Sequence, residues 1–188
     1  MKLRLRETEI VLGYEAVAAM TAALLLDKEG RLVCCFLAAI LHECGHLVML
    51  LCFRCRVKSV VLRLFDVKLV ADPPKNVKEN VLITAAGVTA NFLFAAVCFP
   101  FSKKLCIANC VIGCFNLLPM ESLDGGRLLS LWLSRRLSDI AVERAVKILT
   151  FVLLTPIFCG GIFVLLRTKY NYSLLAVSLY LLTVLFLH

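Results

Sequence analysis

The feature that most constrains this chain is an unbroken apolar run from Leu32 to Phe53, in which Glu43 is the only charged residue. The run has the length of a helix that crosses a bilayer, which needs about 20 apolar residues. An ionised side chain at the bilayer centre costs about 2.5–3.5 kcal/mol on insertion scales. A carboxylate flanked by His42 and His46 in such a helix therefore indicates a functional site.

The composition predicts an integral membrane protein with little room for a soluble domain. Of the 188 residues 61% are hydrophobic, whereas soluble domains contain about 45–50% apolar residues. The net charge of +8 does not indicate nucleic-acid binding, because the basic residues lie in short segments between apolar runs. Most of the ten cysteines lie inside apolar runs, where cysteine packs as a small hydrophobic residue.

The apolar runs predict a single membrane domain over residues 1–188, all-α in class, with about six transmembrane helices. The expected spans are residues 10–26, 32–53, 80–101, 105–133, 148–166 and 172–187. Pro119 and the polar residues that follow it predict that the fourth span is broken near residues 119–126, and such a break is tolerated where backbone lines a wet cavity.

A small β-hairpin is expected after the second span, at about residues 57–72. Two short runs rich in β-branched residues alternate in polarity around Phe65 and Asp66, and Pro73-Pro74 follows the second run. We expect this hairpin to lie at the membrane surface.

The distribution of Lys and Arg predicts a cytoplasmic N-terminus. Fourteen of these residues fall in residues 1–9, 54–79 and 135–147, which lie on one side in the six-span arrangement, and six fall on the other side. The first side is cytoplasmic by the positive-inside rule. Since His46 precedes Phe53 by seven residues, or about 10 Å of helix, the site is expected nearer the cytoplasmic face.

Residues 42–46 read His-Glu-Cys-Gly-His, the HExxH pattern of zinc peptidases. Residues four apart share a helix face, so His42 and His46 can bind one metal ion while Glu43 reaches a water as general base. The alternative is that the two histidines are buried and hydrogen-bonded across helices. The third histidine of the chain, His188, is its last residue.

Catalytic zinc takes three protein ligands and a water, so a third ligand is required. The acidic candidates within apolar segments are Glu15, Glu121 and Asp124. Asp124 is favoured because Gly125-Gly126 follow it and permit a sharp turn with close approach of the backbone. The alternative is that Asp124 caps a helix that begins near Gly125.

These residues, together with Asn116-Leu117-Leu118-Pro119 and Leu123-Asp124-Gly125, resemble the motifs of the site-2 protease family of intramembrane zinc peptidases. Gly87 and Asn91, four residues apart, are similar to the family's third-span motif. The chain departs from the family pattern at Val88, where Pro is frequent, and at Glu121-Ser122. Without a PDZ insertion or room for a CBS domain, it resembles the minimal core of the bacterial sporulation-type branch.

The resemblance implies one catalytic Zn²⁺ held by His42, His46 and Asp124, with Glu43 as the catalytic base. It implies cleavage of a membrane-embedded or membrane-tethered protein near the cytoplasmic face of a bacterial cell membrane. Asn116 and Asn91 are candidates to bind the substrate, and for both the alternative is hydrogen bonding between helices. Separate membrane proteins are the expected regulators, and the sequence leaves the oligomeric state open.

Two other functions are compatible with parts of this pattern. A catalytically silent zinc-binding scaffold would keep the ligands, although the loss of Glu43 would be expected in it. A metal transporter would carry several intramembrane His and Asp sites along a path, whereas the sequence contains one cluster.

Overall fold

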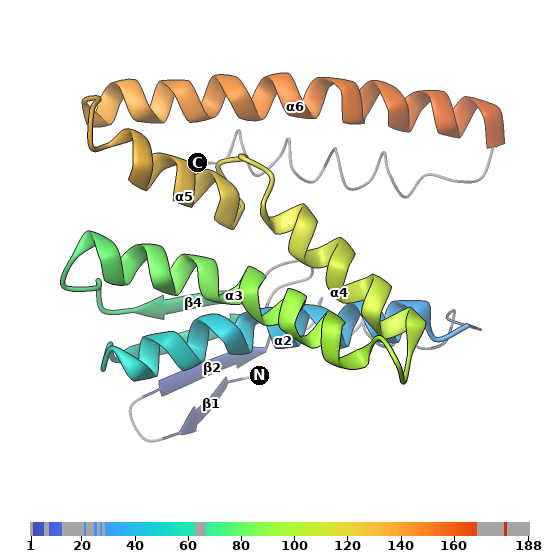
Figure 1. Ribbon diagram of the computed structural model, residues 1–188, viewed down its shortest axis with the longest axis horizontal. Helices are drawn as coiled ribbons and strands as arrows, with labels where there is room; N and C mark the ends of the chain where they lie inside the picture. Colours follow the sequence, from blue (N-terminus) through green and yellow to red (C-terminus); the bar gives the residue numbers. More distant parts are fainter. Residues whose placement is uncertain are drawn as a thin grey trace. The chain divides into compact units, whose positions relative to one another are not determined.

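The computed structural model describes residues 2–5, 8–12, 21, 25, 27, 29–62, 67–168 and 179. These residues are mostly helical (Figure 1). The helices are α2 (Arg31–Cys52), α3 (Val77–Cys98), α4 (Lys103–Asn116), α5 (Asp124–Leu133) and α6 (Asp139–Thr168). The chain divides into two compact units, Met1–Phe115 and Asn116–His188, and each is described separately.

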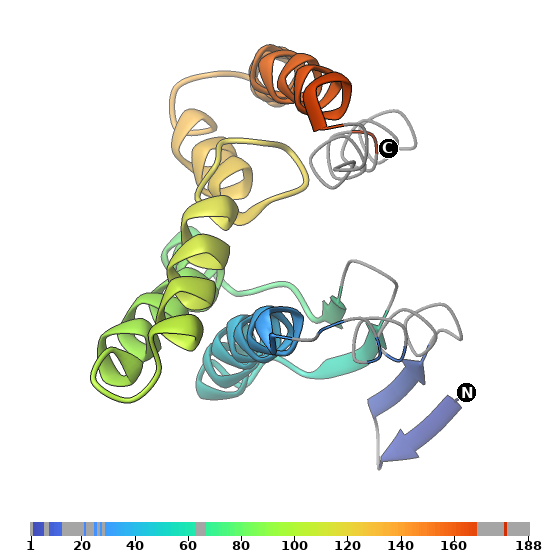
Figure 2. The same ribbon diagram turned by 90° about the vertical axis from the view of Figure 1, so that its right-hand side faces the viewer.

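In the first unit, α2 packs against α3 and also contacts the strand β4 (Val67–Ala71). Figure 2 looks along α2, with the strands to one side of it and α3 and α4 to the other. The 22 residues of α2 extend over about 33 Å at 1.5 Å per residue, enough to cross a bilayer. The predicted second span is therefore present as one continuous helix.

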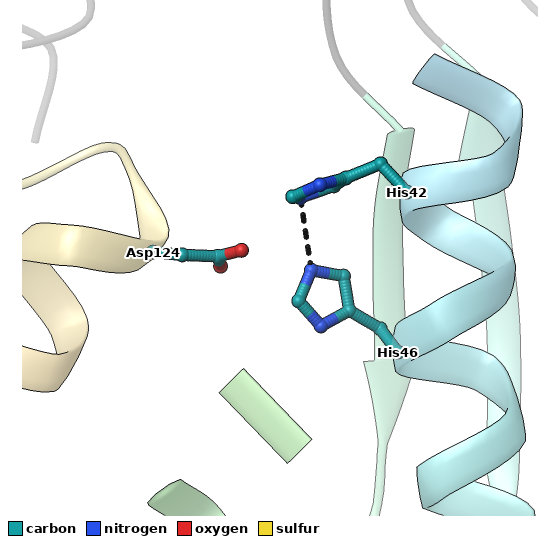
Figure 3. A group of neighbouring side chains, drawn as sticks. All are labelled: His42, His46 and Asp124. Atoms are coloured by element: carbon teal, nitrogen blue, oxygen red, sulfur yellow. Dashed lines mark hydrogen bonds between the residues drawn. The ribbon is translucent and has the colours of Figure 1, made fainter. Parts of the chain in front are cut away.

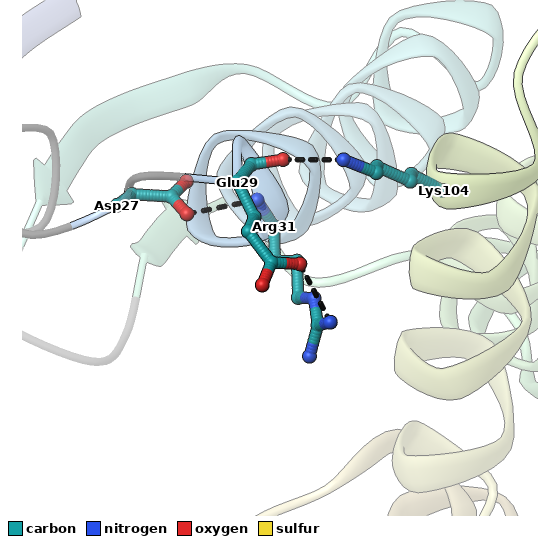
Figure 4. A network of polar contacts seen from close by, with 4 residues as sticks. All are labelled: Asp27, Glu29, Arg31 and Lys104. Atoms are coloured by element: carbon teal, nitrogen blue, oxygen red, sulfur yellow. Dashed lines mark hydrogen bonds and ion pairs between the residues drawn. The ribbon is translucent and has the colours of Figure 1, made fainter.

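Polar contacts hold the beginning of α2 (Figure 4). The Asp27 carboxylate accepts hydrogen bonds from the backbone N–H groups of Arg31 (2.9 Å) and Val33 (3.0 Å). The Lys104 ammonium, at the start of α4, donates to the backbone carbonyl of Glu29 at 2.6 Å. The bonds to Asp27 satisfy N–H groups of the first turn of α2 that have no partner within the helix. The bond from Lys104 attaches the beginning of α4 to the residues that precede α2.

The end of α2 is a tight turn in which a non-glycine residue takes the left-handed conformation. Arg54 has φ 56°, and the N–H of Cys55 donates to the carbonyl of Leu50 at 2.9 Å. This six-to-one bond is typical of a Schellman-type helix end. It directs the chain from α2 into the sheet.

The sheet has four strands in the order β1-β2-β3-β4. They are β1 (Lys2–Leu5), β2 (Thr8–Leu12), β3 (Val57–Leu62) and β4. β3 and β4 form the antiparallel hairpin expected at residues 57–72, and β2 pairs with β3 in parallel, with Ile10 opposite Val60. The expected helical fold with a hairpin after the second span is therefore confirmed in its main features, and β1 and β2 extend the hairpin to a four-stranded sheet. The apolar runs predict that residues 10–12 begin the first span, but these residues form part of β2 because they pair with β3.

Three helices of the described residues are long and apolar enough to cross a membrane, namely α2, α3 and α6. The fourth expected span is two separate helices, α4 and α5, joined by residues 117–123. The six expected spans are not confirmed as a set, because most of residues 13–26 and 172–187 lie outside the described residues.

In the second unit α5 packs against α6. The backbone N–H of Glu121 donates to the Thr150 hydroxyl of α6 at 2.9 Å, which anchors the connection before α5. α6 begins at Asp139, nine residues before the span expected from Ile148, and it contains Pro156 within the helix.

Candidate metal centre

His42 and His46 lie on one face of α2, as the spacing of four residues predicts. Their Nε2 atoms are 3.1 Å apart, and the rings meet edge to face at an interplanar angle of 82°. His42 is buried and His46 is half-buried. Figure 3 shows both rings extending from α2 with these two nitrogens facing each other.

The other ring nitrogen of each histidine has a fixed neighbour on α3. His46 Nδ1 lies 2.8 Å from the backbone carbonyl oxygen of Ile83, and His42 Nδ1 lies 2.7 Å from the side-chain Oδ1 of Asn91. Because both neighbours are oxygen acceptors, each Nδ1 carries the proton and donates it. In a neutral imidazole the Nε2 then presents a lone pair.

Two such lone pairs at 3.1 Å repel each other unless a cation lies between the rings. Zinc binds imidazole nitrogen at about 2.0–2.1 Å, and two tetrahedral ligands at this distance stand about 3.3 Å apart. Outer hydrogen bonds from the other ring nitrogen to a carbonyl or carboxylate are a usual feature of histidine ligands. The separation and the tautomers of this pair therefore fit a divalent metal such as zinc.

Gly87 on α3 leaves the space that the two rings occupy. A Cβ built on Gly87 would lie 2.7 Å from Cε1 and 2.8 Å from Nε2 of His42, and it would also overlap Nε2 of His46. Gly45 on α2 is similarly close to α3, since a Cβ there would meet the Ala86 carbonyl oxygen at 2.7 Å. The two glycines allow α2 and α3 to approach closely around the imidazoles.

Asn91 is fully buried, with 0% of its surface exposed. Its amide nitrogen donates to the Ala38 carbonyl at 2.9 Å and to Asn109 Oδ1 at 3.0 Å, while its Oδ1 accepts from His42. Of the two interpretations of Asn91, substrate binding or hydrogen bonding between helices, the geometry favours the second.

Asp124 belongs to the second unit and is the first residue of α5. The residue at the N-cap position is Leu123, so Asp124 is not the cap, although a carboxylate in the first turn is favoured by the helix dipole. The Asp124 side chain is buried. Gly125 and Gly126 are required here, because a Cβ on either would overlap the carbonyls of the preceding connection, including Leu118 and Met120.

Two further predicted site residues are half-buried. Glu43 lies on α2 directly after His42, and Asn116 is the last residue of α4. Asn116 precedes the connection that leads to Asp124. The roles predicted for Glu43 and Asn116 stay predictions.

Two features of the site are absent from the sequence-based prediction. Asn109 is a fully buried polar residue on α4, and its position within an apolar segment is a signal that points to an interhelical contact. The Ile83 carbonyl has no signal in the sequence, because any residue at that position supplies the same group.

The cysteines add no metal ligand to this centre. All ten are free, and the group of described His, Cys, Asp and Glu side chains that could hold a metal contains no cysteine. Cys52 is exposed and Cys55 is buried. Of the ten cysteines, five are exposed, three are half-buried and two are buried.

No protein-family model matches the sequence, and none of the curated proteins compared with it is a significant match. Among solved structures, the chain is similar to the site-2 protease from Methanocaldococcus jannaschii, with a TM-score of 0.72 and 20% sequence identity. The match covers 96% of this chain and 91% of that chain. The chain therefore has the site-2 protease fold, and the apolar helices make it a membrane protein.

Proposed function

We propose that this protein is an intramembrane zinc metalloprotease that cleaves a membrane-embedded or membrane-tethered protein near the cytoplasmic face. The observation that carries the proposal is the His42–His46 pair, whose Nε2 atoms face each other at 3.1 Å while both Nδ1 atoms donate to oxygen. The likeness in fold to a site-2 protease supports the same function.

The proposed ligands of one zinc ion are His42, His46 and Asp124. Two imidazole nitrogens and one carboxylate oxygen are a donor set of the kind that binds zinc. These three residues would hold the ion, and a zinc ion held by them would supply a Lewis acid that activates water and polarises the scissile carbonyl.

Glu43 is the proposed general base. It takes the proton from the attacking water and transfers it to the leaving amine, so that one carboxylate serves both halves of the hydrolysis. A step of this kind contributes about 10²–10⁴-fold to the rate. Because Glu43 belongs to the same helix as His42 and His46, α2 fixes the base relative to these two proposed ligands.

A substrate helix hides its peptide carbonyls, so it must unwind before cleavage. β4 is an edge of the described sheet, with β3 as its neighbour, and an unwound segment can add to such an edge by main-chain hydrogen bonds. The amide of Asn116, at the end of α4, is proposed to contact the substrate backbone. We further propose that separate membrane proteins regulate the enzyme, and that it resides in a bacterial cell membrane.

The test compares wild type with Glu43→Gln in the native host and measures membrane protein fragments by quantitative proteomics. We expect one or more membrane stubs to accumulate in the variant, because Gln cannot take a proton while the zinc ligands stay intact. Purified Glu43→Gln protein should still contain one zinc per chain. Cleavage that continues in a zinc-loaded variant would show that Glu43 is not the base.

The same variants separate the alternative functions. A silent scaffold should be unaffected by Glu43→Gln and sensitive to Asp124→Ala, which removes a proposed ligand. A transporter should also tolerate Glu43→Gln, and metal flux into sealed vesicles would identify it. A protease should lose cleavage with either substitution.

A further inference from the structure

Asn91 and Asn109 form a buried chain of side-chain amides that leads from α4 to His42. Both residues have 0% of their surface exposed. Asn109 donates to the Leu105 carbonyl at 2.9 Å, and its oxygen accepts from Asn91 at 3.0 Å. The oxygen of Asn91 is 2.7 Å from Nδ1 of His42.

Two backbone carbonyls, those of Leu105 and Ala38, determine the orientation of these two amides. The Leu105 carbonyl can only accept, so the amide nitrogen of Asn109 must point to it and the Asn109 oxygen must point to Asn91. The amide nitrogen of Asn91 therefore faces two acceptors, Asn109 Oδ1 and the Ala38 carbonyl. The oxygen of Asn91 is left to face His42, whose Nδ1 must then carry the proton.

A reversed Asn91 amide would have the opposite effect on the metal centre. Its oxygen would face the two acceptors, and its nitrogen would face His42 Nδ1, which would have to accept. The proton of a neutral His42 would then lie on Nε2, the atom that faces His46. The orientation of Asn91 thus decides whether Nε2 of His42 can act as a ligand.

The two histidines differ in how their tautomers are set. A backbone carbonyl, that of Ile83, sets the tautomer of His46, and no side chain can reverse it. A side-chain amide, which can rotate, sets that of His42. A change at Asn109 should therefore affect His42 and leave His46 unchanged.

We infer that Asn109 is a positioning residue of the metal centre, which acts together with the Ala38 carbonyl to hold the Asn91 amide in one orientation and so keeps the Nε2 of His42 unprotonated for the metal. The inference rests on the proposed metal-binding function of His42. Asn109 acts through Asn91 and touches neither histidine ring.

The first test measures metal-free wild-type protein in lipid nanodiscs. Because the chain has three histidines, ¹⁵N labelling of histidine gives a spectrum in which each ring can be assigned by removing one histidine at a time. For the neutral rings we expect His42 and His46 both to carry the proton on Nδ1. A proton on Nε2 of His42 overturns the inference.

The second test compares Asn109→Leu, which keeps the branched shape of the side chain but removes its acceptor, with Asn109→Asp, which keeps an acceptor oxygen. We expect Asn109→Leu to give a mixture of His42 tautomers and a zinc affinity lowered about 10–100-fold. Asn109→Asp should keep the wild-type His42 tautomer, and both variants should keep that of His46. Zinc affinity is measured by competition with a chelator.

Ala108→Val is the matched packing control, because Ala108 is a buried neighbour on α4 outside the amide chain. It should leave both tautomers unchanged. An unchanged His42 tautomer in Asn109→Leu, or equal changes at both histidines, overturns the inference. If wild type binds no zinc, the proposed function fails, while the tautomer of His42 still decides the role of Asn109.

Discussion

Nε2 of His42 and Nε2 of His46 face each other at 3.1 Å, although neither atom carries a proton when both rings are neutral. Nitrogen atoms that meet in this way are stabilised by a cation. The pair therefore explains why two imidazoles lie in a helix that is apolar enough to cross a membrane.

Removing one imidazole is expected to abolish stoichiometric zinc binding. Purified wild-type protein, prepared without a histidine tag, should contain one zinc per chain after gel filtration, and His46→Ala should contain less than about a tenth of that because a tetrahedral site loses one of its three protein ligands. The measurement is elemental analysis of both proteins. His188→Ala is the control and should keep its zinc, and equal metal in His46→Ala would exclude the pair as ligands.

Gly87→Ala is expected to weaken zinc binding without removing any ligand. The added methyl would overlap both rings, and moving a ligand from its position should lower zinc affinity by at least about 10-fold, the effect of a lost outer-shell contact. Chelator competition measures this change. Gly161→Ala is the control, because Gly161 is a buried glycine of a different helix, α6. Affinity unchanged in Gly87→Ala would show that the rings can shift freely.

Asp27, which precedes α2, should stabilise the folded protein less in acid than at neutral pH. Burial acts to raise the pKa of the Asp27 carboxyl, but hydrogen bonds from the backbone N–H groups of Val33, Arg31, Leu32 and Glu29 together hold that pKa below its ordinary value. The ionised carboxylate therefore stabilises the folded state above the unfolded-state pKa of about 3.9. This contribution is lost as the pH falls through the lower, folded-state pKa.

Asp27→Ala tests this prediction by thermal unfolding at two pH values. At pH 7 the variant should unfold at a lower temperature than wild type. The difference should shrink as the pH falls below about 3.9, where the unfolded chain takes up the proton, and vanish below the lower folded-state pKa. Glu29→Ala is a neighbouring control that keeps the backbone carbonyl contacted by Lys104. A difference that does not change with pH would contradict the role of the charge.

The pairing of β2 with β3 places the N-terminal strands and the hairpin on one side of the membrane, because hydrogen-bonded strands share a compartment. We expect this side to be cytoplasmic, since both segments are rich in Lys and Arg. A protease cleavage site inserted between Pro74 and Lys75 should be cut in inverted vesicles and protected in right-side-out vesicles. A site inserted between Phe101 and Ser102, after α3, should show the opposite pattern.

Much of the centre was predictable because its signals are local. The spacing of four residues puts His42 and His46 on one helix face whatever their surroundings are, and alternating polarity predicted the β3–β4 hairpin. The polar residues after Pro119 predicted the interruption between α4 and α5. Each of these patterns depends on the geometry of one element or one turn.

Other features depend on contacts between distant segments. The sequence from Thr8 to Leu12 determines an apolar stretch, but pairing with β3 makes it a strand, because the hydrogen bonds of a sheet come from residues far along the chain. By itself the sequence determined the imidazole pair, its position in an apolar helix and the hairpin. The tertiary structure decided which nitrogen of each ring carries the proton, because the acceptors that bind those protons, Ile83 and Asn91, lie on another helix.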